Sequence, residues 1–179
     1  VLVLDSAYGV KGCLEPLQTH SSLVTIARVR SNRVFYQVPE AEAYSGKGRR
    51  PWYGERFALN NADTWHPADE AVEFTEMGRN GPIHVEIQAW SNMLMRGSKE
   101  HPMQTHPFTL IRVERRSAQG HRIGKVMWLI VIGKQRLDFG QKGDVQVMHY
   151  GEEKGDYLKN HLPLDQYASH QHSEGTVRV

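Results

Sequence analysis

The sequence predicts an α/β fold built around a sheet, and three observations support this prediction. The chain opens with an aliphatic run, Val1–Leu4, which is typical of a short strand buried on both faces. A second apolar run, Leu23–Arg30, follows a connection that carries leucines at helical spacing. A third run, Lys125–Gly133, is almost continuously apolar and is expected to be a central strand. Strands separated by a helical connection indicate an α/β sheet.

The remaining elements follow in chain order. Within the connection Tyr8–His20, Leu14 and Leu17 favour a short helix, and Val34–Tyr36 is a short extended piece. From residue 39 to 67, Gly, Pro, Arg and Asn dominate, which predicts a long loop. Beyond it the signals are β. The expected strands are Ala71–Phe74, Ile83–Trp90 and Phe108–Arg115, and the expected turns are Gly78–Gly81 and Ser117–Gly120.

Composition limits the classes of protein. The 179 residues favour one domain, with or without an insertion, and 39% hydrophobic residues support a packed core. The net charge of +2 is too small to require a polyanionic partner, so local clusters matter more. The single cysteine, Cys13, is typical of a reducing compartment. No run approaches the roughly 20 apolar residues of a membrane span, and no signal peptide opens the chain, so we expect a soluble intracellular protein.

Asp5 is the first candidate functional residue. It directly follows the opening strand, at the rim of the sheet where α/β proteins bind ligands. Carboxylate oxygens suit Mg²⁺, and two-metal phosphoryl-transfer sites gather carboxylates from separate strands. The alternative is that Asp5 only caps a turn or helix. A phosphatase of the haloacid dehalogenase class would need a second Asp at Ala7, which argues against that reaction.

Two groups of basic residues are candidates for binding nucleic acid. They are Arg28, Arg30 and Arg33 around a turn, and Lys47, Arg49 and Arg50 in a glycine-rich loop. Arg28 and Arg30 share one face of their strand, and arginine forks suit phosphate oxygens. The alternative is a solvated basic face.

Other residues near the glycine-rich loop support the same hypothesis. Gly46 and Gly48 let the backbone approach a polyanion, and Tyr44, Trp52 and Tyr53 are suited to stacking on unpaired bases. The ten histidines lack a zinc-ligand pattern and are expected to be exposed. The other tryptophans, Trp65, Trp90 and Trp128, are expected to pack in the core or against loops.

The order of these motifs resembles the DDE transposases of bacterial insertion sequences, and is closest to the IS4-like and IS701-like groups. The matching pieces are Val3–Gly9, Leu23–Arg33, Tyr44–Arg49 and Met127–Gly133. The resemblance implies a partial RNase H-like fold with a β-rich insertion. It divides the chain into an RNase H-like part (1–38), a loop and insertion (39–124), a return strand (125–140) and an atypical, poorly packed tail (141–179).

The resemblance also implies an activity and partners. Three acids of the family bind Mg²⁺ and drive DNA cleavage and strand transfer at transposon ends, and Asp5 matches the second acid. DNA is the implied partner, contacted by the basic residues above. No membrane partner is expected, a dimer is possible in the intact enzyme, and the location is the cytoplasm, associated with the nucleoid.

Two acids of the family pattern have no counterpart. The first should lie upstream, and the third should lie in a Tyr-x-x-Arg-Phe-x-x-Glu-like segment after Gly133, which Glu152 and Glu153 do not match. We therefore expect sequence before Val1, a frameshift or truncation after about residue 137, and an inactive transposase fragment. One alternative is a non-catalytic nucleic-acid-binding module that uses the basic loop. Another is a phosphohydrolase that uses Asp5.

Overall fold

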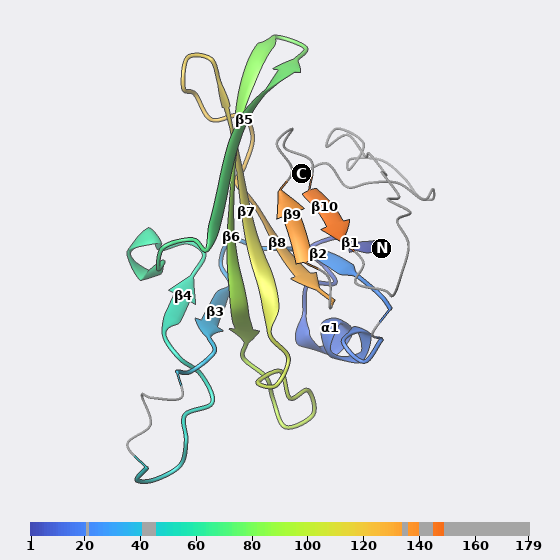
Figure 1. Ribbon diagram of the computed structural model, residues 1–179, viewed down its shortest axis with the longest axis vertical. Coiled ribbons are helices and arrows are strands. Elements are labelled where there is room, and N and C mark those ends of the chain that lie inside the picture. The colour runs from blue at the N-terminus through green and yellow to red at the C-terminus, as the bar shows by residue number, and fades with distance from the viewer. Residues whose placement is uncertain (21, 41–45, 134–135, 140–144, 149–179) are drawn as a thin grey trace.

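A computed structural model describes residues 1–20, 22–40, 46–133, 136–139 and 145–148 (Figure 1). Within these residues, strands make up most of the regular structure. The elements are β1 (Leu2–Leu4), α1 (Lys11–Leu17), β2 (Thr25–Val29), β3 (Val34–Gln37), β4 (Arg56–Ala58), the 3₁₀-helix η1 (Ala62–Thr64), β5 (Glu70–Gly78), β6 (Gly81–Met95), β7 (Phe108–Ser117), β8 (Met127–Ile132), β9 (Arg136–Phe139) and β10 (Val145–Met148).

A curled mixed sheet forms the body of the molecule. Its strand order is β1-β2-β8-β7-β6-β3-β4, and β5 also pairs with β6. The β1–β2 pair is parallel, and the other pairs of this sheet are antiparallel. The long strand β6 pairs with β5 along its first part and with β3 at its end. The register against β7 shifts between Trp90 and Met93, where Asn92 adopts a positive φ of 56°.

The α/β prediction is correct for the sheet and for the helical connection α1, but the described structure is mostly β. From β5 onward the described strands of the large sheet follow one another antiparallel, and the predicted turn Gly78–Gly81 closes the β5–β6 hairpin. Hairpins need only short turns, whereas parallel pairs need a crossover, usually a helix. Strands β5, β6 and β7 are also longer than predicted. β5 and the Gly81 end of β6 reach beyond the buried region, whereas the other end of β6 continues past the predicted strand into the buried residues Met93–Met95.

The opening strand was predicted to be buried on both faces, and this is wrong. Among the described residues β1 pairs only with β2, so it lies at an edge of the sheet. Leu4 packs against the core, whereas the side chain of Val3 on the opposite face is exposed. An aliphatic run looks the same in sequence whether its strand has one neighbour or two.

Both faces of the sheet carry a hydrophobic cluster. The larger cluster contains Leu14 of α1 and an aromatic group, and the smaller contains residues such as Val24, Ile87 and Val131. Trp90 and Trp128 are each only 2% exposed, which confirms their predicted place in the core. The central position predicted for the run at 125–133 is also confirmed, because β8 lies between β2 and β7.

The segment from 39 to 67 was predicted to be a loop throughout, and its second half differs. It contains β4 and η1, and Phe57 of β4 is fully buried. The Phe57 ring lies 5.8 Å from Trp65, 5.1 Å from Trp90 and 6.3 Å from Trp128, measured between ring centroids. A strand of three residues between polar neighbours is too short to show a periodic pattern.

Parts of the predicted organisation remain predictions. The segments 1–38, 39–124 and 125–140 all contribute strands to one sheet, because β2 pairs with β8 and β3 pairs with β6. Residues 149–179, most of the tail predicted to pack poorly, lie outside the described residues. No helix in the described ranges is both long and apolar enough to cross a membrane.

Candidate functional site at the sheet edge and in the basic loops

Asp5 lies immediately after β1 and is exposed. Its Oδ1 accepts a hydrogen bond from the backbone N–H of Ser6 at 2.6 Å, and its carbonyl oxygen accepts one from the N–H of Tyr8 at 2.9 Å. These bonds lie within the turn that directly follows β1. Helix α1 begins at Lys11 with Val10 at its N-cap, so the side chain of Asp5 does not cap this helix. Its Oδ2 has no hydrogen-bond partner among the described residues, so this oxygen can still contact a ligand.

The turn after Asp5 is held closely against β2. Leu4 pairs with Ala27, so the next position along the sheet sets Asp5 level with Arg28. Gly9 is buried there, and a Cβ atom on it would lie 2.6 Å from the carbonyl oxygen of Arg28. No side chain fits in that space, which explains why a glycine closes the turn. The result is a carboxylate after the edge strand β1 level with an arginine of the neighbouring strand β2.

The first basic group follows this edge. Arg28 is exposed between the buried residues Ala27 and Val29, and Arg30 is also exposed. Arg33 is half-buried, and its N–H donates to the carbonyl oxygen of Arg30 at 3.2 Å. These residues form a basic turn between β2 and β3.

The second basic group lies on the glycine loop, which we define as residues 46–54. Lys47, Arg49 and Arg50 are all exposed, and Gly46 and Gly48 have φ values of +79° and +81°, in the left-handed region that favours glycine. This loop follows β3, whereas the arginine turn precedes β3. A four-residue strand spans about 13 Å, so the structure does not bring the two basic groups together. Tyr44 lies outside the described residues.

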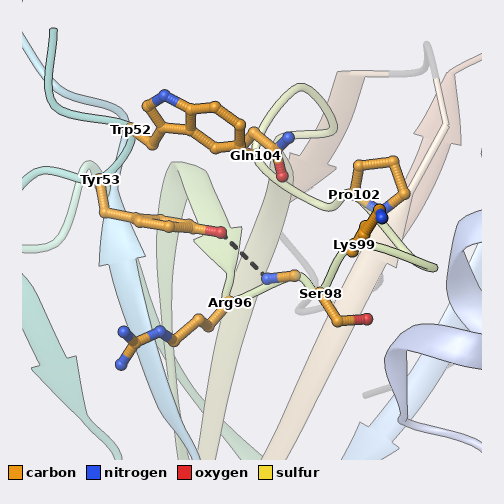
Figure 2. A pocket seen from close by; sticks show the side chains of 8 residues that line it. Trp52, Tyr53, Arg96, Ser98, Lys99, Pro102 and Gln104 are labelled. Carbon is orange, nitrogen blue, oxygen red and sulfur yellow. Dashed lines mark hydrogen bonds between the residues drawn. The ribbon is translucent and has the colours of Figure 1, made fainter. Parts of the chain in front are cut away.

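An open pocket of about 510 Å³ lies between the glycine loop and the β6–β7 connection. Figure 2 shows Trp52 and Tyr53 on one side and Ser98 and Lys99 on the other, with the side chain of Arg96 extending below Tyr53. The backbone N–H of Gly97 donates to the hydroxyl of Tyr53 at 3.0 Å and joins the two walls. The guanidinium carbon of Arg49 lies 4.5 Å from the centroid of the Trp52 ring, within cation–π range.

The sequence analysis missed Arg96 and Lys99. The hydrogen bond that joins the walls connects residues 44 positions apart, and no local pattern predicts such a contact. The only signal was compositional, since a basic residue follows β6 directly and another lies three residues further on.

A metal centre is not complete in the described part of the chain. No group of three or more His, Cys, Asp or Glu side chains lies there in an arrangement that holds a metal ion. Asp5 supplies one carboxylate, and a two-metal site needs several carboxylate ligands. The described residues therefore do not by themselves fit the Mg²⁺ ions that the sequence analysis expected.

Comparison with protein families provides the decisive observation. A sequence profile described as DDE superfamily endonuclease matches residues 1–97, more than half of the chain. The chain belongs to the DDE superfamily endonuclease family. The resemblance to DDE transposases is thereby confirmed, and the match contains Asp5 and all of the predicted basic residues. Comparison with curated proteins and with solved structures finds no match.

Membership in this family indicates a substrate and a metal for the family as a whole. The family implies DNA as the substrate, and members generally use a divalent metal. The matched region ends just after β6, so β7 and β8, which complete the sheet, lie beyond it.

Proposed function

We propose that this chain derives from a transposase that cleaves and joins DNA strands at transposon ends, and that Asp5 is one of three acids that bind Mg²⁺. The observation that carries the proposal is the family match across the segment containing Asp5. The local structure supports it. The parallel strands β1 and β2 joined by α1 form a β–α–β unit, as expected for part of an RNase H-like core, and Asp5 follows the first of these strands.

The other two acids come from outside the described residues. Among the described residues no group of three or more His, Cys, Asp or Glu side chains is arranged to hold a metal ion. Neither Glu152 nor Glu153 matches the segment expected for the third acid. One carboxylate cannot assemble a two-metal site, so we propose that the chain of 179 residues has no strand-transfer activity alone. In this proposal residues 1–38 and 125–140 belong to the catalytic core and residues 39–124 form the inserted β-rich part. Dimerisation, if required, is a property of the intact enzyme.

The first prediction concerns Asp5. The DNA flanking this reading frame should encode an upstream strand ending in Asp and a downstream helix with Tyr-Arg-Phe and Glu. In a protein extended to include both, Asp5→Asn is expected to lower Mg²⁺-dependent cleavage of transposon ends by at least about 100-fold, because changes even one shell from a metal cost about 10–100-fold. Cleavage and joining of labelled DNA ends measure this effect.

The control for this experiment is Asp63→Asn, which alters an exposed acid of η1 and should leave cleavage unchanged. Joining of ends by the chain of 179 residues alone would contradict the proposed incompleteness. Full cleavage by the extended Asp5→Asn protein would contradict the role of Asp5.

The pocket beside the glycine loop favours a second candidate function, a non-catalytic module that binds single-stranded nucleic acid. Trp52 is 45% exposed and borders the pocket, and Arg49, Arg96 and Lys99 lie in or next to it. Base stacking on an aromatic ring contributes about 1–3 kcal/mol per base, and the cations would neutralise the backbone. This function does not require Asp5.

The second prediction therefore uses Trp52 as a reporter. Trp90 and Trp128 are buried, and Trp65 packs against the core. Trp52 is the most exposed of the four tryptophans, so a single-stranded oligonucleotide should quench mainly the fluorescence of Trp52. Trp52→Leu is expected to weaken binding by about 10-fold, from the loss of one stacked base. Tyr8→Leu, at another exposed aromatic residue, and Asp5→Asn should leave binding unchanged. The pocket is not a base-binding site if the oligonucleotide does not quench the fluorescence of Trp52 and binds the Trp52→Leu variant as tightly as the unaltered chain.

A further inference from the structure

A buried carboxylate on β7 binds three arginines. Glu114 is only 1% exposed. Its Oε1 forms an ion pair with Nη2 of Arg116 at 2.6 Å and accepts a hydrogen bond from Nε of Arg122 at 3.0 Å. Its Oε2 pairs with Arg112, which is buried on the same strand. The three arginines come from β7 and from the β7–β8 connection, away from the residues described above.

The charges in this cluster do not balance. Nη1 of Arg112 also lies 3.6 Å from Oε2 of Glu86, so Arg112 forms ion pairs with two carboxylates. Arg116 and Arg122 both pair with Glu114 as well. Three guanidinium groups thus face two carboxylates. Arg116 and Arg122 are also opposite each other in an antiparallel bridge, where like charges are destabilising.

The charge imbalance also affects Arg112. Burial lowers the pKa of its guanidinium, Glu86 opposes this change, and the positive charges of Arg122 and Arg116 lower the pKa further. After burial, the charges of Arg122 and Arg116 thus also act unfavourably on the charged form of Arg112. An additional anion would relieve this effect.

The outer two arginines are accessible to such an anion. The side chains of Arg116 and Arg122 are 48% and 55% exposed. In the part of the chain that the structure describes, the terminal nitrogens of Arg122 have no hydrogen-bond partner. Glu114 therefore holds the adjacent guanidinium groups of Arg116 and Arg122 in place. The terminal N–H groups of Arg122 remain available to a ligand from solvent.

The surroundings are positive as well. We define the hairpin tip as residues 75–84 and 114–125, the outer ends of β5–β6 and of the β7–β8 connection, which project from the same end of the molecule (Figure 1). The tip carries five Arg or Lys and two Glu side chains, a net charge of +3, compared with +2 for the whole chain. Its exposed large hydrophobic residues are Met77 and Ile123, neither of them aromatic.

We propose that Arg116 and Arg122, positioned by Glu114, bind phosphates of the duplex DNA backbone. Two adjacent guanidinium groups on one carboxylate form a preorganised fork for phosphate oxygens. The lack of an exposed aromatic residue at the described tip favours backbone contact with a duplex over stacking on unpaired bases. The choice of DNA rests on the proposed function, whereas the phosphate chemistry comes from the cluster itself.

The third prediction tests this site by fluorescence anisotropy, with the full chain and a labelled duplex titrated at several NaCl concentrations. The double variant Arg116→Ala, Arg122→Ala should lower the slope of log affinity against log salt by about 1 per lost phosphate contact, so by about 2 in total. Affinity should fall by about 10-fold or more, equally for two duplexes of unrelated sequence.

The matched control is Arg115→Gln on the same strand. Arg115 lies on the opposite face of β7 from Glu114 and pairs one-to-one with Glu76 at 2.6 Å. This variant should retain most of the salt slope. The variant Arg116→Lys, Arg122→Lys retains the charges, and it should bind more tightly than the alanine variant. Thermal unfolding of each variant shows that the comparison is made on folded protein.

The outcomes separate this site from the proposed function. An unchanged salt slope in the alanine variant, or no duplex binding by the unaltered chain, overturns the phosphate site and leaves the proposal for Asp5 standing. A smaller salt slope in the alanine variant supports the phosphate site. Full cleavage of DNA by the extended Asp5→Asn protein would overturn only the catalytic proposal and would leave the phosphate site standing. Asp5→Asn itself should leave duplex affinity unchanged.

Discussion

Glu114→Gln is expected to lower the free energy of unfolding by about 3–5 kcal/mol, because removing one partner of a buried ion pair leaves the other charge uncompensated. The side chain of Arg112 is only 11% exposed, and Glu114 is its closest carboxylate. When the negative charge of Glu114 is removed, little water can therefore reach Arg112 to solvate its positive charge. Gln keeps the size of the side chain, so the loss reports charge and hydrogen bonding and not a cavity. Denaturant unfolding of the purified chain measures it.

The control for Glu114 is Glu76→Gln. Glu76 pairs with Arg115 at 2.6 Å, but about a third of each side chain is exposed. Partly exposed pairs contribute about 0–1 kcal/mol, so this substitution should have little effect. Equal effects at Glu76 and Glu114 would show that burial does not make the arginine cluster important for stability.

Phe57→Ala is expected to destabilise the fold by a similar amount, about 3–5 kcal/mol, because it opens a cavity in the core. Phe57 is 0% exposed, and its ring contacts Trp65, Trp90 and Trp128. Two of these tryptophans belong to strands of the main sheet, so the short strand β4 closes one side of the larger cluster. Small domains have a total stability of about 5–15 kcal/mol, so this substitution removes a large part of it.

Trp52→Ala serves as the control for Phe57, since both residues come from the segment predicted to be a loop. Trp52 is 45% exposed and its described ring contact is with Arg49, so its loss should cost about 1 kcal/mol or less. Near-UV circular dichroism together with denaturant unfolding would show whether the tryptophan cluster loses its fixed packing. A small effect of Phe57→Ala would mean that β4 is not part of the cooperative core.

Three regions of the chain are now connected to DNA by different observations. The sheet edge with Asp5 and Arg28 lies in the segment that matches the family. The pocket beside the glycine loop combines an aromatic ring with cations, and the hairpin tip carries an unbalanced arginine cluster. Because Asp5→Asn, Trp52→Leu and the double arginine variant are expected to change different measurements, the three regions can be tested independently.

The sequence by itself determined the features that depend on local patterns. Alternation and apolar runs predicted β2, β6, β7 and β8, and glycine pairs predicted the hairpin turn between β5 and β6. The order of motifs led to the DDE family without any knowledge of the structure. These signals are reliable because the period of a strand and the backbone freedom of glycine act within a few residues.

Tertiary structure alone decided which of these pieces lie together. It placed β1 at an edge, buried Phe57 among tryptophans, joined Tyr53 to Gly97, and surrounded Glu114 with arginines. From their neighbours in sequence alone, these residues would be predicted to lie in loops or on a solvated surface. Burial and charge pairing depend on contacts between residues far apart along the chain, and such contacts are fixed only when the strands of the sheet pair in register.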